Sequence, residues 1–112
     1  MDDWPNWIHQ LPTVDTQFPG DGKLLACEHG QVVLWSFPAG AQVPIHAHGP
    51  QIGFVVTGRV ILTLDDRPRV IDAGGHFTIG DQVPHAATVA PGTLVVETVS
   101  YTHLTLPTKR IV

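Results

Sequence analysis

Two histidines separated by one residue open the stretch HAHGPQIGFVVTG, residues 46–58. The apolar part of this stretch has the length of one β-strand and ends at Gly58, a turn residue. On a strand, residues i and i+2 point to the same face, so His46 and His48 are predicted to project side by side. Neutral imidazole nitrogen ligates Fe, Mn, Ni, Cu and Zn. The spacing therefore predicts part of a site for one divalent metal ion.

Short apolar runs of strand length follow one another on both sides of this stretch. They cover residues 24–27, 32–37, 51–56, 60–64, 70–71, 77–79 and 94–99. Glycine, proline or aspartate turn signals separate them, and no segment has a comparable helical stripe. Many short strands joined by tight turns close most readily into a β-sandwich or a small β-barrel, because closure removes exposed strand edges. The sequence therefore predicts an all-β fold.

Composition and charge exclude several classes of partner. A chain of 112 residues forms one domain, and its formal charge of −4 gives no positive field for nucleic acid. No apolar run approaches the ~20 residues that cross a bilayer, so no membrane contact is expected. A single cysteine, Cys27, cannot form an internal disulfide, and Asp2 and Asp3 stand where a secretory signal would be basic. We expect a cytoplasmic protein, with Cys27 as a small core residue.

The chain divides into three segments. Residues 1–22 have little periodicity and are predicted to form an irregular arm, in which Trp4 and Trp7 either cover an open end of the barrel or bury a dimer contact. Residues 23–100 form the predicted barrel. Residues 101–112 contain two of the six basic residues and break the register of what precedes them. We interpret them as a tail that is not native sequence.

The first histidine pair lies in a pattern that resembles the first motif of the cupin family. The pattern is Gly40-x5-His46-x-His48-x2-Gln51-x6-Gly58. Members usually supply a glutamate ligand here, whereas this chain has Gln51, one residue early. A glutamine carbonyl oxygen can coordinate a metal ion but carries no charge. Gln51 is therefore expected either to ligate the ion or to hydrogen-bond to a bound water or substrate.

A second stretch resembles the second cupin motif, Gly-x5-Pro-x-Gly-x2-His-x3-Asn. This chain has Gly74-x5-Gly80-x-Gln82-x2-His85-x3-Val89, with Gly80 and Gln82 in place of the proline and the second glycine. The spacing is kept although several residues are not. For His85 the alternative to metal ligation is a buried histidine that only hydrogen-bonds to a backbone carbonyl.

The two motifs together resemble a small single-domain cupin of the type-2, RmlC-like kind. The resemblance implies an antiparallel double-stranded β-helix, or jelly-roll barrel, with a mononuclear divalent metal site. The implied ligands are His46, His48, Gln51 and His85. It also implies a homodimer and a small-molecule ligand.

Two further residues have to be weighed as site candidates. His76 alternates with Phe77 on a predicted strand, so it is expected at the surface. Glu97 is a candidate general base in the cavity, but an exposed carboxylate is the favoured interpretation.

The fold does not choose the function. One hypothesis is a metal-dependent enzyme, like a dioxygenase or isomerase, that acts on a small anionic or carbonyl metabolite. Its alternative is a non-catalytic cupin that binds or senses a metal ion or a small ligand. A third possibility is a structural barrel whose histidines bind nothing.

If the tail is not native sequence, a chain that ends at Ser100 should keep its stability. We expect its melting temperature to lie within a few degrees of that of the full chain, measured by circular dichroism. A much lower melting temperature for the shorter chain would contradict this interpretation.

Overall fold

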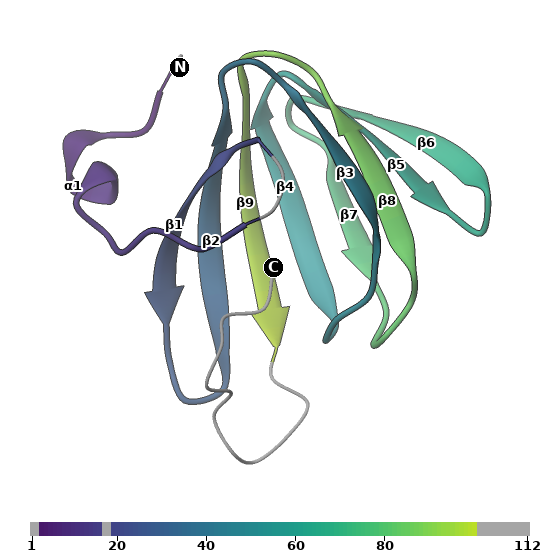
Figure 1. Cartoon of the computed structure of the whole chain (residues 1–112), viewed down its shortest axis with the longest axis horizontal. Coiled ribbons are helices and arrows are strands. Elements are labelled where there is room, and N and C mark those ends of the chain that lie inside the picture. The colour runs from purple at the N-terminus through teal and green to yellow at the C-terminus, as the bar shows by residue number, and fades with distance from the viewer. Residues whose placement is uncertain (1–2, 17–18, 101–112) are drawn as a thin grey trace.

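Nine strands make up nearly all of the regular structure in the computed structural model, which describes residues 3–16 and 19–100 (Figure 1). One short helix, α1 (Asn6–His9), precedes them. The strands are β1 (Asp21–Ala26), β2 (Gly30–Phe37), β3 (Ala41–His46), β4 (Gln51–Thr57), β5 (Arg59–Leu64), β6 (Arg67–Asp72), β7 (His76–Ile79), β8 (His85–Val89) and β9 (Thr93–Ser100). The all-β prediction is confirmed, and the predicted tail, residues 101–112, lies outside the described residues.

The strands form two antiparallel sheets. One has the order β1-β2-β9-β4-β7 and the other the order β3-β8-β5-β6. The sheets lie face to face and most neighbouring strands are far apart in sequence, which is the jelly-roll arrangement expected from the family resemblance (Figure 1). The apolar residues that alternate on the inner faces pack between the sheets, and the rings of Trp35 and Phe37 stack there with their centroids 5.6 Å apart.

The N-terminal arm covers the outer face of the larger sheet. Trp4 and Ile8 are buried against Leu34 of β2 and Leu94 of β9, and the Trp4 indole N–H donates a hydrogen bond to the Trp35 carbonyl at 3.2 Å. The arm therefore covers a sheet face, and the prediction that its tryptophans close an open barrel end is wrong for Trp4. β1 begins at Asp21, inside the segment predicted as irregular. The expected homodimer stays a prediction.

Two strands have no counterpart among the apolar runs of the sequence, and both carry site residues. β3 contains Pro44, which lacks an N–H to donate, and β3 is an edge strand, where proline is tolerated. β8 contains Ala86 and Ala87, which have little β-propensity. Sheet pairing, rather than local sequence, forms these strands.

Cys27 is exposed, so its predicted place in the core is wrong. It follows the last residue of β1, where the chain turns back, and its N–H donates to the Gly30 carbonyl at 2.9 Å. A turn between two strands lies at the surface, whatever its neighbours' hydrophobicity.

Across residues 3–16 and 19–100, no helix has the length and hydrophobicity needed to span a lipid bilayer. The cytoplasmic location stays a prediction.

The Phe77 ring packs directly against the backbone of Gly53 in the core. A Cβ at residue 53 would lie 2.1 Å from the Phe77 ring, so the ring would have to move. We expect Gly53→Ala to lower the free energy of unfolding by about 1–3 kcal/mol, the usual cost of overpacking a core. Gly80→Ala is the control, because its nearest contact is a Val83 methyl group at 3.3 Å. Urea denaturation that gave equal losses for both variants would contradict this expectation.

Candidate metal centre

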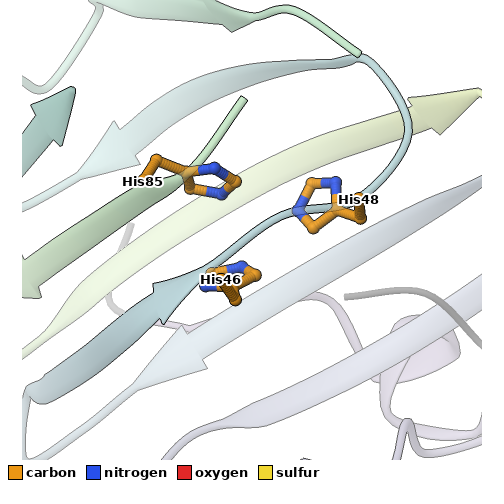
Figure 2. Close-up of side chains that lie close together, drawn as sticks. All are labelled: His46, His48 and His85. Carbon is orange, nitrogen blue, oxygen red and sulfur yellow. The ribbon is translucent and has the colours of Figure 1, made fainter. Parts of the chain in front are cut away.

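Three histidines from different segments meet at one end of the space between the sheets. His46 is the last residue of β3, His48 follows it in the loop, and His85 is the first residue of β8. Figure 2 shows the three rings gathered around one point. Each offers one ligand atom, and these atoms all lie within 4.8 Å of one another. Nitrogens bonded to one ion at about 2.0–2.1 Å lie roughly 3–3.4 Å apart, so any pair of rings near the 4.8 Å limit has to move more than about 1 Å closer to bind the ion.

A β-bulge turns His46 toward the interior. β3 pairs with β8 in one register as far as Val43 and in a shifted register at His46, where His46 lies opposite His85. Without the shift, strict alternation would put Ile45 on the same face as Val43. Instead Ile45 is 72% exposed and His46 is half-buried. The extra residue in the bulge, next to Pro44, therefore aims the imidazole at its partner.

His48 reaches the site by a different route from the one predicted. It lies outside any strand, so the same-face argument for residues i and i+2 does not apply to it. Its carbonyl accepts a hydrogen bond from the Gln82 N–H at 2.8 Å, which ties this loop to the loop that leads to His85. Gln82 has φ 57°, a left-handed conformation, at the position where the family motif has glycine. This chain thus adopts a left-handed conformation here without a glycine.

Hydrogen bonds fix the tautomer of all three rings. The Nδ1 atoms of His46, His48 and His85 lie 2.9, 2.8 and 2.9 Å from the carbonyl oxygens of Pro44, Gly49 and Val83, respectively. A carbonyl only accepts, so each Nδ1 carries the proton and each Nε2 presents a lone pair. Neutral histidines that bind metal through Nε2 have this arrangement.

The buried atoms of the site fit a metal ion. The His48 Nε2 and the Gln51 Oε1 are buried and have no hydrogen-bond partner within the described residues. Leaving a buried polar atom unpaired costs about 1–3 kcal/mol. Both atoms are lone-pair donors, so one cation satisfies both.

Burial also keeps the rings neutral. Desolvation lowers the pKa of His85 to about 4 and also lowers the pKa of His48, although a hydrogen bond to a carbonyl opposes the shift in each case. Repulsion from the neighbouring histidines lowers both values further. A proton therefore competes with a metal ion for these two rings only at a pH below the pKa of a free imidazole.

A small cavity of about 60 Å³ opens beside the histidines, between the two sheets. His46, Gln51, His85 and Glu97 supply its polar lining. Its remaining walls are apolar and include the Trp35, Phe77 and Leu62 side chains. Gln51, the first residue of β4, thus lines the same cavity as two of the histidines.

Glu97 faces this cavity, so the favoured interpretation of it as an exposed carboxylate is wrong. It lies on β9 in phase with Val95 and Val99, both core residues. Burial raises the pKa of its carboxyl to about 7, while a hydrogen bond from the Gln51 amide partly opposes the rise. The residues on the other face, Leu94 and Val96, are also apolar because the arm covers them. With apolar residues on both faces, alternation alone does not reveal which side Glu97 occupies.

His76 lies outside the cluster, as predicted. It is exposed on β7, and its ring packs beside that of Phe54 with the centroids 6.1 Å apart.

Comparison with known proteins places this arrangement in a family. A cupin-domain family model matches residues 33–101, more than half of the chain. No curated protein is similar enough to count as a match.

Solved structures agree with the family match. An RmlC-like cupin from Shewanella frigidimarina NCIMB 400 is 26% identical over 82% of this chain and 85% of that chain, with a TM-score of 0.72. KdgF from Halomonas sp. is 25% identical over 85% of this chain and 92% of that chain, also with a TM-score of 0.72. The polyketide cyclase RemF from Streptomyces resistomycificus is 17% identical over 88% and 78% of the two chains, with a TM-score of 0.67, and shows the likeness of fold alone.

The lowered pKa of His85 should appear as a pH-dependent stability of the metal-free protein. His85 has a pKa of about 6.5 in the unfolded chain and of about 4 in the folded protein. Stability from this residue is therefore complete above about pH 6.5 and is lost as the pH falls toward 4.

His85→Gln removes this contribution. We expect the wild-type protein to lose about 2–3 kcal/mol more unfolding free energy than the variant between pH 7 and pH 4, because the fall in pKa from 6.5 to about 4 corresponds to about 3.4 kcal/mol in full and most of it is lost by pH 4. Urea denaturation at both pH values measures the difference. The same difference between the two proteins at pH 7 and at pH 4 would exclude this role for His85.

Proposed function

The chain belongs to the cupin family, and from that premise we propose that His46, His48 and His85 hold one divalent metal ion at which a small anionic or carbonyl metabolite binds. The observation that carries the proposal is the cluster of three imidazoles whose ligand atoms lie within 4.8 Å of one another, each ring held by a hydrogen bond at Nδ1 that leaves Nε2 free to ligate (Figure 2). A structural barrel has no need for such a cluster, since the unpaired buried His48 Nε2 only reduces its stability.

Gln51 supports the same proposal as a fourth ligand. Its Oε1 is buried, lacks a hydrogen-bond partner within the described residues and lines the cavity beside His46 and His85. Three imidazoles and one amide are neutral, so the donor set leaves the charge of a divalent ion uncompensated. Such a centre favours an anionic or strongly polarised oxygen from the ligand.

The residues around the centre suit chemistry on a carbonyl or enolate. A bound divalent ion supplies Lewis acidity, which polarises a carbonyl oxygen. Glu97 adds a carboxyl whose pKa of about 7 lets it hold or release a proton near neutral pH. The walls of the same space are largely apolar, and a low local dielectric strengthens the electrostatic interactions within it.

The cavity limits the size of the ligand part that enters it. A volume of about 60 Å³ holds about five water molecules, at roughly 10–15 Å³ each. The enclosed part of a ligand therefore contains only a few non-hydrogen atoms. Half-buried His46 lies toward solvent, so a longer ligand extends past it.

Catalysis by an isomerase-like or dioxygenase-like reaction is the first form of the proposal, because Glu97 adds a proton-transferring group to the site. A non-catalytic metal or ligand sensor is the alternative. Substrate turnover with Fe²⁺, Mn²⁺ or Zn²⁺ that His48→Ala abolishes would support an enzyme. A melting temperature raised by one class of metabolite, without turnover, would support a sensor.

Metal binding itself is tested by replacing one ligand. We expect untagged wild-type protein to bind one equivalent of Zn²⁺ and His48→Ala to bind it more than ~100-fold more weakly, since second-shell changes alone cost 10–100-fold. His76→Ala is the matched control, because His76 is exposed and outside the cluster. Elemental analysis and calorimetry give stoichiometry and affinity. Wild-type affinity in His48→Ala would refute the proposed centre.

A further inference from the structure

Glu97 and Gln51 form a pair across two neighbouring strands. β9 and β4 are antiparallel, with Gly53 opposite Glu97 and Gln51 opposite Val99. Gln51 and Glu97 are therefore diagonal neighbours on the inner face, at a separation that long side chains bridge. Gly53, directly opposite Glu97, has no side chain to separate them. Both side chains line the same cavity, and a hydrogen bond from the Gln51 amide is one of the causes that set the pKa of the Glu97 carboxyl.

This hydrogen bond determines which way the Gln51 amide faces. The hydrogen bond lowers the pKa of the Glu97 carboxyl, which is the effect of a bond donated to it, so the Gln51 Nε2–H₂ group is the donor. The Oε1 atom then lies on the other side of the amide, and it is this atom that is buried without a partner in the described part of the chain. A flipped amide would instead present N–H groups to the lone pairs of the histidines.

We propose that Glu97 is a positioning residue: it holds the Gln51 amide with Nε2 toward itself and leaves Oε1 free to ligate the ion held by the three histidines. This inference rests on the proposed metal centre. It also accounts for glutamine at residue 51. A glutamate there would place a second carboxylate against Glu97 in a largely apolar cavity, and two adjacent carboxylates do not both ionise readily. The pair therefore carries at most one negative charge, on Glu97 and not on the residue proposed as the ligand.

The first test is the orientation of the amide in the metal-loaded protein. Glu97→Leu removes the acceptor, whereas Glu97→Gln keeps one, its own Oε1. We expect Glu97→Leu to bind Co²⁺ ~10–100-fold more weakly and to change its visible absorption spectrum. Glu97→Gln should keep the wild-type spectrum and lose less affinity. Glu28→Gln, at the only other glutamate and on the surface, is the control. Wild-type affinity and spectrum in Glu97→Leu would overturn the proposal.

The second test needs no metal. In the metal-free protein, Gln51→Glu should lower the melting temperature by several degrees, because the amide donor is lost and two carboxyl groups would face each other in a largely apolar cavity. The exchanged pair, Gln51→Glu with Glu97→Gln, should recover most of that loss. Equal melting temperatures for the single and the double variant would overturn the pairing. This outcome is distinct from failure of the metal centre, which appears as wild-type metal affinity in His48→Ala.

Discussion

The site depends on three hydrogen bonds from imidazole Nδ1–H groups to backbone carbonyls. Each bond closes over one or two residues, so the backbone that carries a histidine also sets the ring's orientation and its protonation. The backbone in turn is fixed by the pairing of β3 with β8 and by the contact between the Gln82 N–H and the His48 carbonyl. Burial then suppresses protonation of His48 and His85. The donor atoms are thereby arranged before any ligand is bound.

The edge position of β3 makes this arrangement possible. Each N–H in a central strand pairs with a neighbouring strand, so proline, which has no N–H, is not tolerated there. An edge strand tolerates proline at a position whose N–H would face away from the sheet. Pro44 and the register shift beside it end regular alternation and turn His46 inward and Ile45 outward. On the opposite sheet, Gln51 and Glu97 come from two adjacent strands whose inner faces continue the core. Irregular backbone supplies the histidines, and regular strands supply the groups that surround them.

The sequence was sufficient for the fold class and for the three histidines, because the motif spacing of His46, His48 and His85 does not depend on knowing the strands. It was not sufficient where two environments compete for one segment. β9 is apolar on both faces, since one face lines the cavity and the other packs against Trp4 and Ile8. The alternation of residues therefore did not show which face of the strand carries Glu97. β3 and β8 lack the β-branched runs that mark strands, because pairing forms them. The arm's docking face is likewise set by contacts between distant residues.

The link between the His48 carbonyl and the Gln82 N–H has a consequence for the order in which the molecule assembles. No segment shorter than residues 46–85 contains all three rings, and their approach requires strands that are distant in sequence to have paired. Contacts of such long range form late during folding. An ion that needs all three nitrogen atoms therefore cannot act as a template for the early chain. An ion bound by all three rings would meet strands that have already paired, so its binding would stabilise the finished fold rather than start its formation.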